Sequence, residues 1–141
     1  MITGNTHFAI ATHVLTALAF QDSTTPLTST QLAESIDTNP AFLRAVLGRL
    51  RDAGLVRTQL GKGGGAFIAR PAESITLLDV YRATEGRARV SSHDCSASAC
   101  IVARTMPEIL ARIDRQLDSA LATELSKTTV ADLRHEVRQH V

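Results

Sequence analysis

The chain has 141 residues, of which 44% are apolar and 21% are charged. This composition excludes an intrinsically disordered chain and is enough for one domain core with an additional helical segment. The net charge is only +1, but residues 1–43 carry −3, residues 44–70 carry +5 and residues 71–141 carry −1. The basic central band is typical of a phosphate-contacting surface, although an arginine-rich, solvated helix face gives similar counts.

The first predicted element is a helix over about residues 7–20. Residues 8–20 form an apolar run of thirteen residues, interrupted by His13, which is too short to span a bilayer. The first basic residue is Arg44, so no signal-peptide pattern precedes the run. We therefore predict a buried core helix, with His13 as a core histidine, in a cytoplasmic protein.

Capping signals predict the next two helices. Thr28-Ser29-Thr30-Gln31 is a capping box, which predicts a helix from there to about Ile36. Asn39 then offers an N-cap oxygen, and Pro40 stands at the first helical position, where a missing N–H costs nothing. This third helix is predicted to end at Gly54. The positions outside its apolar stripe are Arg44, Gly48, Arg49 and Arg51.

A basic hairpin is predicted directly after the third helix. The segment GLVRTQLGKGGGAFIARP, residues 54–71, contains two strand-like runs, residues 55–60 and 66–69, around the tip 61–65. Several glycines at a tip are costly in conformational entropy, so they indicate positive φ angles or a close backbone approach. A helix followed by a basic, glycine-tipped hairpin is the order of elements in a winged helix-turn-helix.

Two further capping boxes and one long helix complete the chain. Thr76-Leu77-Leu78-Asp79 predicts a helix that stops at Gly86, residues 87–99 resemble a loop, and Thr129-Val130-Ala131-Asp132 begins a last short helix. Residues 100–126 show helical periodicity, with Pro107 marking a kink or the true start. The apolar stripe of this helix consists of Met106, Leu110, Ile113, Leu117, Leu121 and Leu125.

The length of this helix predicts a dimer. A helix of about twenty residues reaches roughly 30 Å, about the width of the preceding domain, so a second copy of the chain is expected to cover its stripe. The alternative is a helix that folds back along its own domain. We predict a mainly α (α+β) fold. Its expected parts are a winged helix-turn-helix domain over residues 1–86, a sensor-type loop over 87–100, and dimerisation and C-terminal helices over 101–141.

The segment LTSTQLAESIDTNPAFLRAVLGRLRDAGLVRTQLGKGGGAFIARPAESITLLDVYRATEG resembles the core of the bacterial Rrf-two (Rrf2) family of winged-helix transcription regulators. The ending TTVADL is similar to the usual C-terminal ending of the family. The resemblance covers nearly the whole chain and implies a dimeric DNA binder. We predict a sequence-specific regulator, a homodimeric repressor on a pseudo-palindromic operator, rather than an enzyme, because no nucleophile–base pair or complete metal-ligand set is present. The alternative is a winged-helix docking module that does not bind DNA.

The cysteines depart from the pattern of the cluster-binding members. Those members carry three cysteines before the long helix, whereas this chain has Cys95 and Cys100, with Met106 near the expected third position. A thioether is a poor ligand for cluster iron, so we expect no cofactor, and CIVARTMPEILARIDRQL resembles a cluster-free, YwnA-like subgroup. An iron–sulfur or zinc site that recruits His7, His93 or Asp94, a thiol switch at Cys95 and Cys100, and two purely structural cysteines remain open.

The predicted DNA contacts lie on the third helix and the hairpin. Arg44 is the side chain at the start of this helix that can contact a guanine in bidentate fashion, and Lys62 suits a slim wing tip near phosphates or the minor groove. Arg49 is expected either to contact phosphate or to face solvent. The full predicted set is Thr28, Thr38, Asn39, Ala41, Arg44, Ala45, Arg49, Arg57, Lys62, Gly63 and Gly64.

Overall fold

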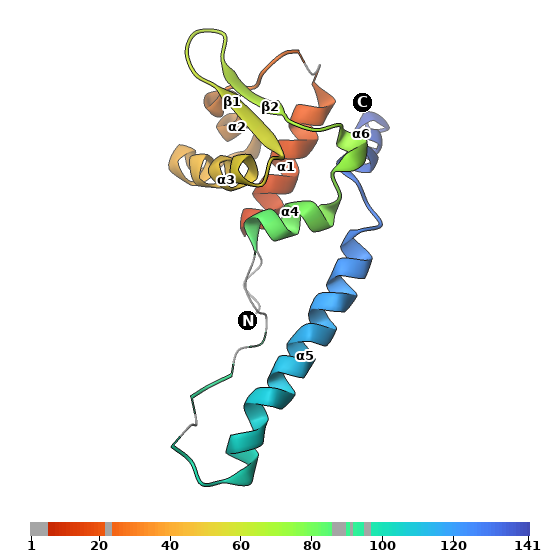
Figure 1. Cartoon of the computed structure of the whole chain (residues 1–141). Helices are drawn as coiled ribbons and strands as arrows, with labels where there is room; N and C mark the ends of the chain where they lie inside the picture. The colour runs from red at the N-terminus through yellow and green to blue at the C-terminus, as the bar shows by residue number, and fades with distance from the viewer. Residues whose placement is uncertain (1–5, 22–23, 86–89, 91, 95–96) are drawn as a thin grey trace. The chain divides into compact units, whose positions relative to one another are not determined.

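The computed structural model describes residues 6–21, 24–85, 90, 92–94 and 97–141, which fall into two compact units. The winged unit comprises residues from 1–86 and 126–141, and the long-helix unit comprises residues from 87–125. The described elements are α1 (Thr6–Phe20), α2 (Ser29–Ile36), α3 (Pro40–Asp52), β1 (Val56–Gln59), β2 (Gly65–Ile68), the 3-10 turn η1 (Ala72–Ser74), α4 (Leu77–Thr84), α5 (Ile101–Leu125) and α6 (Val130–Arg138). Figure 1 shows their path.

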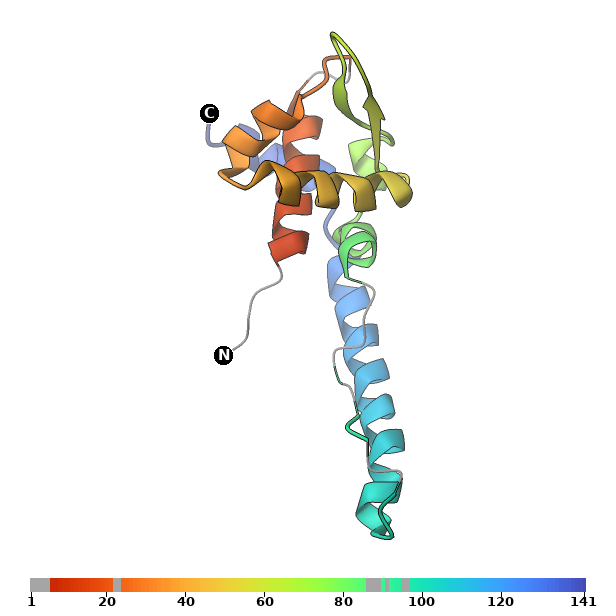
Figure 2. The same ribbon diagram turned by 90° about the vertical axis from the view of Figure 1, so that its left-hand side faces the viewer.

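Helix α1 is the centre of the winged unit. It contacts α2, α3, α4, α6 and β2, so it is covered on several sides rather than along one stripe. Figures 1 and 2 show α3 and α6 on opposite sides of α1. The buried residues of α1 are Ile10, Ala11, Val14, Leu15, Leu18 and Ala19. The prediction of a buried first helix is confirmed, but the prediction that His13 is a core histidine is wrong: its side chain is exposed, and its Nε2 lies 3.2 Å from Ser35 Oγ.

The helix starts that the capping signals predicted are confirmed. Thr28, Thr76 and Thr129 each accept a hydrogen bond from the backbone N–H three residues later, and the side chain of that later residue accepts one in return. Asn39 Oδ1 accepts from the N–H of Ala41 at 2.8 Å, at the start of α3. These caps satisfy backbone donors that have no partner within the helix, and they set where α2, α3, α4 and α6 begin.

The wing is a two-stranded antiparallel sheet in which Val56 faces Ile68 and Gln59 faces Gly65. A third segment, which the sequence did not indicate, pairs with it. Leu27 and Ala66 exchange two backbone hydrogen bonds, of 3.1 and 2.8 Å. The chain that enters α2 is therefore attached directly to the wing.

Helix α6 belongs to the winged unit in the structure, whereas the sequence grouped residues 101–141 together. The N–H of Val130 donates to the carbonyl oxygen of Ile75 at 2.8 Å, and the N–H of Leu77 donates to that of Thr128 at 2.9 Å. Val130 is fully buried, and Arg134 forms a 2.7 Å ion pair with Glu73. Backbone pairing with the start of α4 and burial of Val130 therefore place α6 in the core of the winged unit.

The long-helix unit consists of α5 and the segment that precedes it. Pro107 lies inside α5, so it is not the start of the helix, and none of the described side chains of α5 is buried. On the predicted stripe, Ile113 is 36% exposed and Leu117 is 44% exposed. The N–H of Val90 donates to Asp114 Oδ1 at 2.9 Å and so holds part of the preceding segment against α5. None of the described helices is long and apolar enough to cross a membrane.

We predict that Val130→Ala lowers the free energy of unfolding by about 2 kcal/mol, because it removes two methyl groups from the core of the winged unit. The matched control is Val137→Ala on the same helix, where the side chain is 41% exposed, and the expected change is below about 0.5 kcal/mol. Urea unfolding at one protein concentration measures both. Equal effects would show that α6 is not part of this core.

Candidate nucleic-acid interface

The first turns of α3 present small side chains and one free arginine. Ala41, Arg44 and Ala45 are exposed, and Arg44 forms no hydrogen bond or ion pair with any residue that the structure describes. A free guanidinium beside two methyl groups matches the donors and apolar contacts that major-groove base edges accept. Asn39 serves chiefly as the N-cap, so its amide nitrogen is the part left available for an outside partner.

The turn between α2 and α3 is built without glycine. Asp37 ends α2 with φ 55°, in the left-handed region, and its backbone N–H donates to the last turn of the helix. The N–H of Thr38 donates to the carbonyl oxygen of Ala33 at 3.2 Å, and Thr38 is half-buried. This tight connection joins α2 and α3 as a helix-turn-helix pair, in which Thr28 caps the first helix.

The glycines of the wing tip are required by its geometry. Gly61 and Gly63 have φ angles of 91° and 78°, and the N–H of Gly64 donates to the carbonyl oxygen of Gly61 at 3.0 Å. A Cβ on Gly64 would lie 2.2 Å from the carbonyl oxygen of Gln59, and one on Gly65 would lie 2.7 Å from that of Leu27. Gly64 is buried, so it shapes the tip rather than offering a surface for contact.

The cations of the wing point to solvent. Lys62 and Gly63 are exposed at the tip, and Lys62 has no ion-pair or hydrogen-bond partner among the described residues. Arg57 is exposed on β1, with its guanidinium carbon 4.1 Å from the centre of the Phe67 ring. Stacking of this kind holds the plane of an arginine while leaving its N–H edge able to donate.

Arg49 has a structural partner, which sequence reasoning missed. Its Nη1 donates to the carbonyl oxygen of Thr84 at 2.9 Å, where Thr84 is buried at the end of α4. This bond connects α3 to α4, while Arg49 remains exposed, so phosphate contact by the rest of its guanidinium stays a prediction. Arg51 lies 3.9 Å from Asp52 in an exposed ion pair of little expected energy.

The sensor region contains one described cysteine, Cys100, because Cys95 lies outside the described residues. Cys100 is exposed immediately before α5. Hydrogen bonds to its sulfur from the backbone N–H groups of Ala103 and then Val102 lower the pKa of the Cys100 thiol. A thiol at a helix N-terminus with a lowered pKa is a more reactive thiol.

The predicted metal-ligand candidates are His7, His93, Asp94, Cys95 and Cys100, of which Cys95 lies outside the described residues. The ring of His7 packs against that of Phe42, with 4.6 Å between the centroids. Among the residues with described positions, no three His, Cys, Asp or Glu side chains are grouped so as to hold a metal ion. An iron–sulfur cluster needs several thiolate ligands, and the whole chain has two cysteines. The described residues therefore do not fit a standard cluster site.

The helix pair α2–α3 and the wing that follows it (Figure 2) define a winged helix-turn-helix DNA-binding protein. The profile of the Rrf2 family, described as an iron-dependent transcriptional regulator, matches residues 4–136. The chain belongs to this family. It is a DNA-binding transcriptional regulator, and the family is not one of enzymes.

Individual relatives agree with this assignment. YwnA of Bacillus subtilis (strain 168), named as an HTH-type transcriptional regulator, is 25% identical over 134 residues, covering 94% of this chain and 98% of YwnA. IscR of Cereibacter sphaeroides is 26% identical over 132 residues, covering 93% of this chain and 85% of IscR. A crystal structure of a transcriptional regulator from Lactobacillus plantarum has a TM-score of 0.79 and 25% identity, covering 97% and 93% of the two chains.

We predict that Gly64→Ala destabilises the protein by about 1–3 kcal/mol, because the new methyl group overlaps the backbone of Gln59. The control is Gly48→Ala in the middle of α3, where the nearest atom that the methyl group would meet is Arg51 Nη2 at 4.0 Å. That variant is expected to gain about 0.5–1 kcal/mol from helix propensity. Thermal unfolding compares them, and a stable, wild-type-like Gly64→Ala protein would contradict this geometry of the tip.

Proposed function

We propose that this regulator is a homodimeric repressor that reads a pseudo-palindromic operator with the start of α3 and grips its backbone with the wing. The observation that carries the proposal is that Arg44 on α3 and Lys62 at the wing tip are exposed and have no hydrogen-bond or ion-pair partner among the described residues. Arg44 supplies the donors for a bidentate contact to guanine, and Lys62 supplies a point charge for phosphate. Such a regulator acts in the cytoplasm, where bacterial operators lie.

The dimer part of the proposal is supported by α5. The helix has 25 residues, about 37 Å at 1.5 Å per residue, and it leaves Ile113 and Leu117 at least a third exposed. Further apolar side chains stand at its start, where Ile101 is 68% and Val102 is 58% exposed. A symmetric partner helix would cover this apolar surface. It would also provide a second α3 for the other half-site, about one DNA turn away.

For assembly, we predict that the wild-type chain sediments as a dimer at micromolar concentration and that Leu117→Asp yields monomer or aggregate. The substitution places an unpaired charge in the proposed interface. Ser119→Asp is the matched control, because it adds the same charge about 200° around the helix and should leave the dimer intact. A monodisperse wild-type monomer would contradict the proposal and favour an α5 that packs against its own chain.

Contacts to DNA bases and contacts to the phosphate backbone affect DNA affinity differently. Arg44→Ala is expected to cost about 1–3 kcal/mol of binding, mainly on the operator. Lys62→Ala is expected to weaken binding to operator and scrambled duplex more nearly alike. It should also flatten the dependence of log affinity on log salt by about one unit for each phosphate that a subunit no longer neutralises.

Anisotropy titrations of both variants at several salt concentrations measure these effects, with the operator first selected from genomic fragments. Arg115→Ala in α5 is the control, since it removes the same charge from a helix outside the winged unit. If Lys62→Ala changes neither affinity nor salt slope, the wing does not grip DNA. Equal losses for Arg44→Ala on both duplexes would show that Arg44 reads no base. Unchanged binding in both variants would support the docking-module alternative.

A second proposal concerns redox control at Cys100, whose pKa is lowered by hydrogen bonds from Ala103 and Val102. Its thiolate is accessible to peroxide, because the side chain is exposed. Attack of the sulfur on one peroxide oxygen breaks the O–O bond and gives a sulfenic acid and hydroxide. The change in charge and size at the start of α5 would then alter the assembly that presents the two copies of α3.

We predict that, in a Cys95→Ser background, alkylation of Cys100 by iodoacetamide follows a pH profile with its inflection below that of an ordinary thiol, because a lowered pKa populates the thiolate at lower pH. Peroxide should weaken DNA binding by wild type but not by the Cys95→Ser, Cys100→Ser double variant. Equal peroxide responses would reject the switch. Iron or zinc in stoichiometric amounts in anaerobically prepared protein would instead support a metal-sensing site with unusual ligands.

A further inference from the structure

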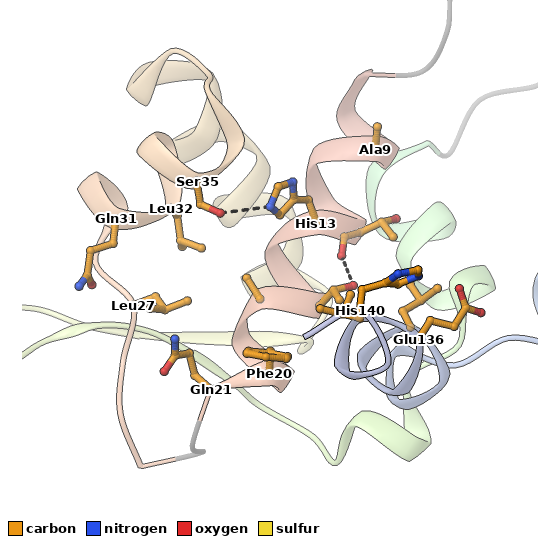
Figure 3. A pocket seen from close by; sticks show the side chains of 15 residues that line it. Ala9, His13, Phe20, Gln21, Leu27, Gln31, Leu32, Ser35, Glu136 and His140 are labelled. Atoms are coloured by element: carbon orange, nitrogen blue, oxygen red, sulfur yellow. Dashed lines mark hydrogen bonds between the residues drawn. The ribbon is translucent and has the colours of Figure 1, made fainter.

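The winged unit contains a groove that DNA recognition leaves unexplained. It has a volume of about 710 Å³ and lies between α2 and α6, with α1 between them. Figure 3 shows His13 of α1 and Ser35 of α2 pointing toward one another at one side, with Glu136 and His140 of the C-terminal segment at the other. A volume of this size is within the range of small-molecule sites.

The groove is apolar with a few polar groups around it. Leu32 in its wall is fully buried, while Phe20 and Val137, which also line it, are 38% and 41% exposed. The guanidinium carbon of Arg138 lies 5.8 Å from the centre of the Phe20 ring. Large apolar side chains that line a concave surface and remain exposed indicate a binding partner. Glu136 is the one lining residue with a formal charge when histidine is counted as neutral, and it has no ion-pair partner in the described part of the chain.

We propose that this groove binds a small amphipathic molecule with an aromatic or branched aliphatic body and an amino group. The body would cover Phe20 and Val137, and the amino group would lie toward the carboxylate of Glu136. A neutral N–H donor could hydrogen-bond to the Glu136 carboxylate, but more weakly than an ammonium group. The negative charge of Glu136 disfavours a ligand with an anionic head group.

Because of the position of the groove, ligand binding in it should change the affinity of the protein for DNA. This inference rests on the proposed function, in which α3 contacts the operator. Gln31, Leu32 and Ser35 are all on α2, which leads into α3 through the tight turn at Asp37. A ligand held between α2 and α6 interacts with α2 and with a helix on the other side of α1 from α3 (Figure 1). Any difference in its affinity between the free and DNA-bound arrangements of α2 appears as an equal factor in the affinity for DNA.

Binding is tested first without DNA, so that its failure is separate from a failure of the proposed operator recognition. The probes are 2-phenylethylamine and its anionic counterpart phenylacetate, titrated into the full-length protein and followed by amide NMR shifts. The amine is expected to shift resonances of α1, α2 and α6 around the groove, and to bind at least twofold more tightly than phenylacetate. Absence of localised shifts with both probes overturns the proposal, as does tighter binding of phenylacetate.

Three variants test where and how the amine binds. Val137→Trp fills the groove and should abolish the localised shifts, whereas His135→Trp, on the same helix but outside the groove, should retain them. Glu136→Gln should weaken the amine about two- to fivefold, as expected for an exposed ion pair, and leave phenylacetate no weaker. Retained amine binding in Val137→Trp overturns the assignment. Groove shifts that depend on protein concentration without any probe would assign the surface to a second copy of the chain and also overturn it.

The regulatory part is tested with DNA. A saturating amount of the amine should change the anisotropy-measured affinity for the operator at least twofold in wild type and not in Val137→Trp. An unchanged affinity in wild type overturns the coupling between groove and α3.

Discussion

The need to cover helix α1 determines the arrangement of the winged unit. Six of its side chains are buried, so water must be excluded from several sides of one apolar helix. Helices α2, α3, α4 and α6 and strand β2 together achieve this. Because each of them packs on the same helix, the position of the DNA-reading helix and the position of the C-terminal helix both depend on α1. Hydrophobic burial, which is the largest favourable contribution to folding, is therefore also what orients the functional surface.

Polar contacts refine this arrangement rather than create it. The Arg49–Thr84 hydrogen bond joins α3 to α4, and the Leu27–Ala66 bridge joins the entry of α2 to the wing. The Leu27–Ala66 bridge connects the helix-turn-helix to the wing, and in the proposed function the cations on α3 and on the wing tip contact one duplex. The same arrangement leaves the gap between α2 and α6 incompletely filled, which is the groove that we assign to an effector.

Much of the fold could be predicted because its signals are local. The three capping boxes, Pro40 and the tip glycines act on their own backbone neighbourhood, and all of them mark the boundaries found in the structure. What sequence reasoning missed depends on residues far apart in the chain. The packing of α6 in the winged unit, the Arg49–Thr84 hydrogen bond and the Leu27–Ala66 bridge are contacts between distant parts of the chain. Helical and strand periodicity does not predict such contacts. For the same reason, the sequence predicted the DNA-contact residues from their positions on α3 and the wing. The close contact of Gly64 with the backbone of Gln59 and the bond of Arg49 to Thr84 became visible only in the structure.

We propose that the start of α3 and the wing form one DNA-binding surface on the side of α1 that faces away from α6. Amide hydrogen exchange of the protein with and without an operator duplex tests it most directly. We expect added protection in peptides covering residues 39–48 and 57–65, with no change in peptides covering residues 130–138. Protection confined to residues 130–138, with α3 and the wing unchanged, would contradict it.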